Sequence, residues 1–182
     1  MINHLNERLD RYLEKNVTPP LENQGFKYGF NTNYLKEIII YWRHKYLWRE
    51  RERYLNIYPQ FKTNVNGLDI HFIRIKPNVT EKRVIPLLIL HGWPGCVREF
   101  FDLVPFLTAP RNDTDFVFEV ILPSLPGFAF SEGTTKPGLG TSQIAVIMNN
   151  LMKRIGIEKY YAQGGDWGSV ITRQMGTLFP NK

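Results

Sequence analysis

The sequence predicts an α/β protein whose core is a doubly wound, mostly parallel sheet. Residues 85–90 form a short apolar run, and residues 116–122 form a second one. Runs of this length and composition are typical of parallel strands that are buried on both faces. Each run is followed by a loop rich in glycine and proline and then by a helical pattern. The repetition of strand, loop and helix along the chain indicates a doubly wound sheet.

The remaining elements follow from periodicity and turn signals. Apolar residues recur at helical spacing over residues 3–15 and again over residues 34–54, and Pro19-Pro20 separates the two regions. Asn66-Gly67 is a strong hairpin signal between two strand-like segments. Further elements are expected as helices over 98–107 and 142–155, a strand over 159–163, and a helix over 169–178. The chain is therefore divided into a helical N-terminal region, residues 1–60, and the first part of an α/β core, residues 61–182.

The pentapeptide Gly164-Gly165-Asp166-Trp167-Gly168 has the spacing of a nucleophile elbow, with small residues two positions before and after the central residue. Glycines are required there because the turn from strand to helix leaves no room for a Cβ atom. The central residue is an aspartate rather than a serine. A carboxylate that attacks an sp³ carbon forms an ester, which water can cleave, so Asp166 points to epoxide or haloalkane carbons. The alternative is a glycine-rich turn in which Asp166 only caps the next helix.

A second motif, His91-Gly92-Trp93-Pro94-Gly95, follows the apolar run at 85–90. In hydrolases with an elbow, the oxyanion hole takes one backbone amide from this loop and one from the residue after the nucleophile. Here these amides belong to Trp93 and Trp167. His91 precedes the nucleophile in the chain, whereas the catalytic histidine of such enzymes follows it. We therefore predict a structural role for His91.

These segments carry a family resemblance. The motifs at 91–95, 123–133 and 163–169 together resemble the microsomal-type epoxide hydrolases of the α/β-hydrolase superfamily. Residues 97–100 and 136–139 are most similar to the insect juvenile hormone epoxide hydrolases. Haloalkane dehalogenases share the elbow and the oxyanion loop, but residues 54–62 resemble an N-terminal region peculiar to the microsomal-type enzymes. The resemblance also leads us to expect a cis bond between Trp93 and Pro94.

The resemblance implies hydrolysis of apolar epoxides to vicinal diols through an ester on Asp166, with juvenile hormone or xenobiotic epoxides as substrates and no metal or organic cofactor. It also implies two lid tyrosines, a later carboxylate and a later histidine, and the sixteen residues after Asp166 contain none of these. We therefore expect the N-terminal portion of an enzyme, without the lid and the C-terminal core and without turnover by itself. The alternatives are a haloalkane dehalogenase and a truncated, non-catalytic paralogue.

Composition sets wider limits. The chain has 182 residues, is 43% hydrophobic and carries a net charge of +6, and it contains no apolar run of the length that spans a membrane. The family implies association with the cytosolic face of the endoplasmic reticulum membrane, whereas no recognised module accompanies the charge to suggest nucleic-acid binding. The single cysteine excludes an internal disulfide, and the oligomeric state is left open. Three glycosylation sequons, at Asn16, Asn78 and Asn112, are given no role.

Overall fold

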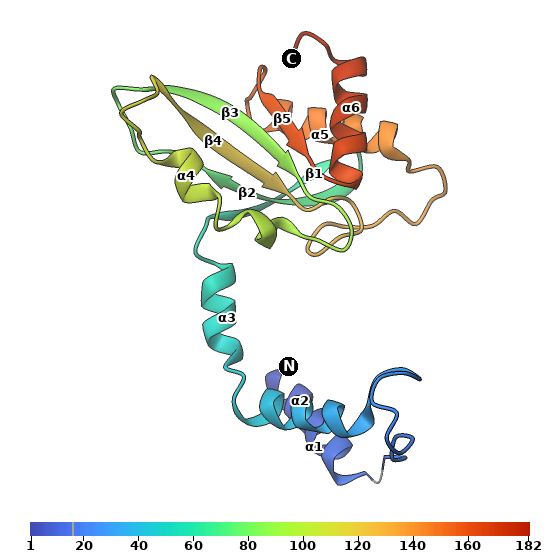
Figure 1. The fold of residues 1–182 in the computed structure, drawn as a ribbon. Coiled ribbons are helices and arrows are strands. Elements are labelled where there is room, and N and C mark those ends of the chain that lie inside the picture. Colours follow the sequence, from blue (N-terminus) through green and yellow to red (C-terminus); the bar gives the residue numbers. More distant parts are fainter. Residues whose placement is uncertain (16) are drawn as a thin grey trace. The chain divides into compact units, whose positions relative to one another are not determined.

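The computed structural model describes residues 1–15 and 17–182, so the sequon at Asn16 lies outside the described residues. The chain divides into two compact units, Met1–Tyr54 and Leu55–Lys182, which are considered separately (Figure 1). None of the helices in the described part of the chain combines the length and the apolarity that a membrane span requires.

The N-terminal unit is helical. Helices α1 (Ile2–Glu14) and α2 (Thr32–His44) pack against each other, and Arg43 on α2 holds Asp10 on α1 through an ion pair of 2.6 Å. Helix α2 begins after Asn31, because the side chain of that residue accepts hydrogen bonds from the first free N–H groups of the helix. The helix expected over residues 3–15 is thus present with slightly different ends.

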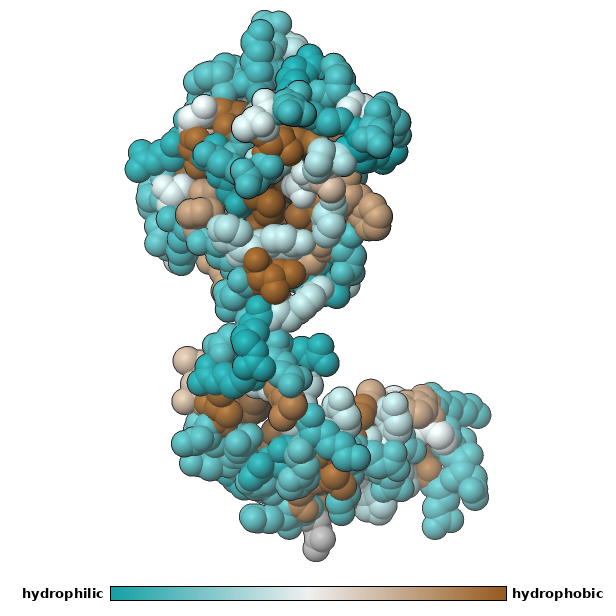
Figure 2. Space-filling view, turned by 90° about the vertical axis from the view of Figure 1, so that its left-hand side faces the viewer, coloured by the Kyte–Doolittle hydropathy of each residue, from teal (hydrophilic) through white to brown (hydrophobic). Residues whose placement is uncertain are grey.

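The helical region expected over residues 34–54 is present, but it is divided. Two helices occupy this segment, α2 and α3 (Trp48–Leu55). The break lies at residues 45–47, where the N–H groups of Lys45 and Tyr46 both donate to the carbonyl of Tyr41 and close the last turn. The apolar periodicity continues across the break, so the pattern alone does not reveal it. Many apolar side chains of this unit remain exposed among hydrophilic ones (Figure 2).

The second unit contains a five-stranded mixed sheet in the order β1-β2-β4-β3-β5 (Figure 1). Strands β3 (Arg83–Leu90), β4 (Phe116–Pro123) and β5 (Tyr161–Gly164) are parallel to one another. Strands β1 (Gln60–Val65) and β2 (Leu68–Ile75) form the expected antiparallel hairpin, and β2 also pairs antiparallel with β4. Asn66 and Gly67 both have positive φ, as a tight two-residue hairpin turn requires.

Helices pack on both faces of this sheet. On one face, α5 (Thr141–Arg154) and α6 (Trp167–Leu178) contact each other and form a core with side chains of the strands. On the other face, the short helix α4 (Val104–Thr108) contacts β4. The core on the side of α5 and α6 contains the fully buried residues Leu88, Leu90, Ile121, Met148, Leu151, Met152 and Ile171.

The continuous helix expected over residues 98–107 is wrong. The segment contains a turn of 3₁₀ helix, η1 (Val97–Phe100), and then α4, which has only five residues. Pro105 explains the break, because a proline lacks the N–H for the helical ladder and is accommodated only in the first turn of a helix. Pro105 occupies that position in α4.

A half-buried ion pair ties β2 to its surroundings. Nε of Arg74 lies 2.6 Å from Oε1 of Glu119 on β4, and another guanidinium nitrogen of Arg74 donates to the carbonyl of Ile155 at 3.0 Å. Ile155 is the residue that ends α5. Arg74 therefore satisfies both a buried carboxylate and a free carbonyl at the end of a helix, where a positive charge is favourable.

Candidate active site

Asp166 lies at the sharp turn between β5 and α6. Its backbone has φ of 48° and ψ of −122°, a conformation that residues other than glycine rarely adopt. Such a conformation persists only where the surrounding structure enforces it, and it is found most often at functional sites. The turn projects the carboxylate away from the sheet at the N-terminus of α6, where the helix dipole favours negative charge.

Close backbone contacts hold this turn in place. A Cβ atom on Gly168 would overlap the carbonyl oxygen of Leu90 and would lie 2.8 Å from the carbonyl oxygen of His91. The first turn of α6 therefore rests directly on the carboxyl end of β3. A Cβ atom on Gly164 would overlap the carbonyl group of Gly168, so the strand and the helix also meet without side chains between them. This packing explains why the motif has glycines at positions 164 and 168.

The loop after β3 supplies a hydrogen-bond donor to the carboxylate. The backbone N–H of Trp93 donates to Oδ1 of Asp166 at 2.6 Å. Gly92 makes this approach possible, because a Cβ atom at that position would overlap the same carboxylate. The peptide bond between Trp93 and Pro94 is cis, as expected from the motif. The structure thus brings together Asp166, Trp93 and Trp167, the three residues singled out from the sequence.

Backbone amides keep Asp166 ionised. The N–H of Trp93 and, to a smaller extent, the N–H of Trp167 lower the pKa of the Asp166 carboxyl below its ordinary value. Of these two amides, Trp93 is the one that reaches full hydrogen-bond geometry with the side chain. Two amides that converge on one carboxylate can also stabilise the charge that develops on an oxygen when an ester at that carbon is hydrolysed.

The ring nitrogens of His91 pair with backbone groups rather than with Asp166. The side chain is buried, and its Nε2 accepts a hydrogen bond of 3.0 Å from the N–H of Leu125. Its Nδ1 lies 3.2 Å from the carbonyl oxygen of Gly92, and the ring packs edge-on against Phe128. Both ring nitrogens are therefore engaged with the backbone of two loops. Burial lowers the pKa of His91, so the neutral form is favoured.

A second buried histidine, which the sequence alone gave no role, stabilises the loop after β4. Nδ1 of His71 lies 2.9 Å from Oγ of Ser124, and Nε2 lies 2.9 Å from Oε1 of Gln60. Ser131 accepts a hydrogen bond from the N–H of His71 and donates one to the carbonyl of Ser124. This network fastens residues 124–131 to β2, and the same loop provides the N–H that reaches His91. Burial lowers the pKa of His71 as well.

The two buried histidines make stability depend on pH. Because their pKa values are lowered from 6.5 in the folded state, the unfolded chain binds more protons than the folded one below about pH 6.5. The contribution of the two neutral histidines to the free energy of unfolding is thus fully present above pH 6.5. It is lost as the pH falls towards the pKa values that these histidines have in the folded state. Each histidine can add a slope of at most about 1.4 kcal/mol per pH unit. Urea unfolding between pH 7.5 and 5.5 should show this loss.

Two matched variants test whether the buried histidines cause the pH dependence of the free energy of unfolding. His71→Gln should reduce the pH dependence, because one of the two proton-binding groups is removed. His4→Gln should leave it unchanged, since His4 is exposed. An unfolding free energy that stays constant over this range, or that rises as the pH falls, would contradict the assignment.

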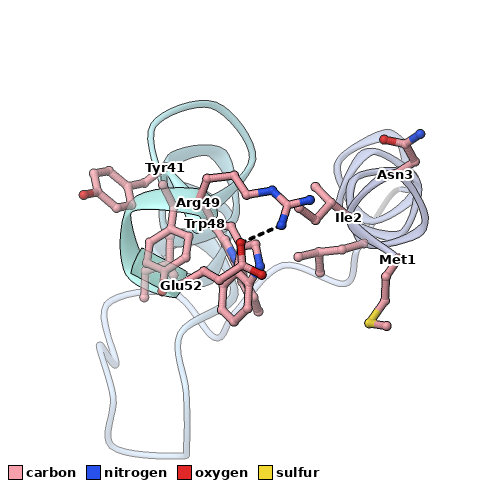
Figure 3. A pocket seen from close by; sticks show the side chains of 11 residues that line it. Met1, Ile2, Asn3, Tyr41, Trp48, Arg49 and Glu52 are labelled. Atoms are coloured by element: carbon pink, nitrogen blue, oxygen red, sulfur yellow. Dashed lines mark hydrogen bonds and ion pairs between the residues drawn. The ribbon is translucent and has the colours of Figure 1, made fainter. Parts of the chain in front are cut away.

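The N-terminal unit contains an apolar pocket, and Asp166, Trp93 and Trp167 are not among the residues that line it. It has a volume of about 970 Å³ and is lined mainly by aromatic and aliphatic side chains from α1, α2 and α3, beside the ion pair of Arg49 and Glu52 (Figure 3). None of the residues that line it is a nucleophile candidate, so we assign no chemistry to it. Among residues 1–15 and 17–182, no group of three or more His, Cys, Asp and Glu side chains is arranged to hold a metal ion.

The chain matches two families. Residues 1–100 match the family described as Epoxide hydrolase N terminus, and residues 85–182 match the family described as alpha/beta hydrolase fold. A curated relative, juvenile hormone epoxide hydrolase 2 of Ctenocephalides felis, is 60% identical over 90% of this chain and 35% of its own length. Epoxide hydrolase 1 of Sus scrofa is 48% identical over 99% of this chain and 40% of its own length.

A solved structure has the same fold. The crystal structure of juvenile hormone epoxide hydrolase from the silkworm Bombyx mori superimposes with a TM-score of 0.90 at 49% identity, over 98% of this chain and 47% of that one. The chain spans 35% to 40% of the length of the two curated relatives above. Together with the elbow and the oxyanion loop, these matches show that the chain belongs to the epoxide hydrolase family of the α/β-hydrolase superfamily.

Proposed function

We propose that the protein hydrolyses apolar epoxides to vicinal diols, with Asp166 as the nucleophile and the amides of Trp93 and Trp167 as the oxyanion hole. The observation that carries this proposal is the 2.6 Å hydrogen bond from the Trp93 N–H to a carboxylate presented on a strained elbow. We place this machinery in an α/β core that begins at about residue 61, after an N-terminal region over residues 1–60.

The hydrogen bond distinguishes the two oxygens of Asp166. Oδ1 is held by Trp93, which leaves Oδ2 to attack one carbon of the epoxide. A bond forms between Oδ2 and that carbon, the ring C–O bond breaks, and an acid protonates the leaving oxygen. In the ester, Oδ1 is the carbonyl oxygen. When water attacks the carboxyl carbon, the negative charge develops on Oδ1, where the Trp93 amide already lies. As this intermediate collapses, the bond between the carboxyl carbon and Oδ2 breaks, one proton of the water passes to Oδ2 and the other returns to the acid, so the diol leaves and the carboxylate is restored.

Apolar substrates suit the surroundings of Asp166. The side chains of Trp93 and Trp167 are exposed, and Trp93 reaches the nucleophile through its backbone N–H while Trp167 follows it directly in the chain, so both rings offer apolar surface to a bound molecule. The names of two relatives refer to juvenile hormone. Juvenile hormone is therefore the narrow proposal for the substrate, and xenobiotic epoxides in a detoxification role are the broad one. Because of its similarity to the same family, we place the protein at the cytosolic face of the endoplasmic reticulum membrane.

Oxygen labelling tests the mechanism directly. In one turnover of the full-length protein in H₂¹⁸O, the diol should contain no label, because its new oxygen comes from Asp166. The peptide that contains Asp166 should gain one ¹⁸O, measured by mass spectrometry after proteolysis. Label in the first diol, with none in Asp166, would mean that water attacks the epoxide directly. Release of halide from haloalkanes without diol formation from epoxides would instead identify a dehalogenase.

A further inference from the structure

One rigid group connects His91 to the nucleophile. The carbonyl of Gly92 and the N–H of Trp93 belong to the same peptide group, which is planar, and in a trans peptide these two bonds point in opposite directions. The oxygen of this group lies 3.2 Å from Nδ1 of His91, and the nitrogen lies 2.6 Å from Oδ1 of Asp166. Whatever fixes the direction of the Gly92 carbonyl therefore also aims the Trp93 N–H.

The hydrogen bonds of His91 determine where its proton lies. A backbone N–H can only donate, so Nε2 of His91 must carry a lone pair to accept from Leu125. In a neutral imidazole the proton then lies on Nδ1, which donates to the carbonyl oxygen of Gly92. The ring cannot turn freely, because it is 1% exposed and packs against Phe128 with ring centroids 5.2 Å apart.

We propose that His91 is a positioning residue, which holds the Gly92–Trp93 peptide group, as the neutral tautomer protonated on Nδ1, with its N–H directed at Oδ1 of Asp166. This inference rests on the proposed function, since it specifies how that oxyanion hole is kept in place. The residue acts through the backbone and does not touch the substrate.

The two chemical steps should respond differently to the loss of this contact. Formation of the ester removes charge from the carboxylate, so it gains nothing from a well-aimed donor at Oδ1. Hydrolysis of the ester places a full charge on Oδ1, and the loss of one oxyanion donor typically costs about 10²–10³-fold in such a step. A misdirected amide should therefore slow hydrolysis, and the ester on Asp166 should accumulate.

Two substitutions of similar polarity separate the contacts of the ring. His91→Asn places an amide N–H near the position of Nδ1 and can still donate to Gly92. His91→Gln reaches the position of Nε2 and can still accept from Leu125, but it leaves Gly92 without a donor. In single-turnover measurements on the full-length protein, we expect ester hydrolysis in His91→Gln to be slower than in wild type by at least about 10-fold. We expect it to stay within a few-fold of wild type in His91→Asn, with ester formation little changed in both.

The tautomer provides a test that needs no variant and no substrate. In ¹⁵N-histidine-labelled full-length protein, long-range ¹H–¹⁵N spectra should show a protonated Nδ1 and an unprotonated Nε2 for His91. A proton on Nε2 would overturn the proposal, and so would equal hydrolysis rates in the Asn and Gln variants. A wild-type protein that forms no ester would refute the proposed function instead, while the tautomer would still decide the position of the proton.

Discussion

Replacement of Asp166 by Asn in the full-length protein is expected to reduce diol formation by at least about 10³-fold, because the amide is a far weaker nucleophile than the carboxylate. The two side chains have nearly the same shape, so the elbow and the contact to Trp93 leave room for the substitution. The rate should be measured from the initial production of diol at saturating substrate. Mass spectrometry should accompany the assay, since conversion of the new Asn back to Asp would restore activity.

Asp115→Asn is the matched control for this loss. Asp115 is exposed and immediately precedes β4, at the amino end of the parallel strands, whereas Asp166 follows β5 at their carboxyl end. The same chemical change at this site should leave the rate unaltered. Activity in Asp166→Asn equal to that of the Asp115→Asn control, with no reversion to Asp, would remove Asp166 as the nucleophile.

Replacement of Gly168 by Ala is expected to lower the free energy of unfolding by about 3 kcal/mol or more and to abolish activity. The added Cβ atom would meet the carbonyl oxygens of Leu90 and His91, which are backbone atoms at the end of β3 and cannot rotate away as a side chain could. To relieve the contact, α6 would have to move away from β3 and carry Asp166 away from the Trp93 amide. Urea unfolding measures the first effect and diol formation the second.

Gly176 provides the comparison on the same helix. Apart from its chain neighbours and the nearby backbone of α6, nothing lies within 4 Å of a Cβ atom built at this position, which is inside α6. Gly176→Ala should therefore raise the free energy of unfolding by up to about 1 kcal/mol, because alanine favours the helix more than glycine does. If both substitutions changed stability by the same amount, close backbone contact would not be the reason for Gly168.

The parts of the fold around Asp166 that were predicted correctly are local in the chain. The elbow could be recognised because its glycines and its aspartate lie within five consecutive residues at the junction of a strand and a helix. The loop at 91–95 directly follows a strongly apolar strand, so its place at the carboxyl edge of the sheet also followed from the sequence. In both cases the signal that identifies the segment lies within a few consecutive residues.

The parts that were missed depend on contacts between distant segments or on a single backbone restriction. The network of His71 and Ser124 joins residues 53 positions apart, and it exists only because β2 pairs with β4 in one register, with Phe72 opposite Pro123. No local pattern encodes that register. The division of residues 98–107 followed from Pro105, whose effect is stronger than the helical periodicity around it.

The hydrogen bond between Trp93 and Asp166 joins residues 73 positions apart, and this separation has a consequence for synthesis of the chain. At about 5–20 residues per second, β3 leaves the ribosome several seconds before the elbow exists. During that interval the side of β3 that later pairs with β5 is an open, apolar strand edge, which can recruit other chains. The nascent protein therefore carries this open edge until β5 has also left the ribosome, and a chaperone that shields the edge would act in that interval.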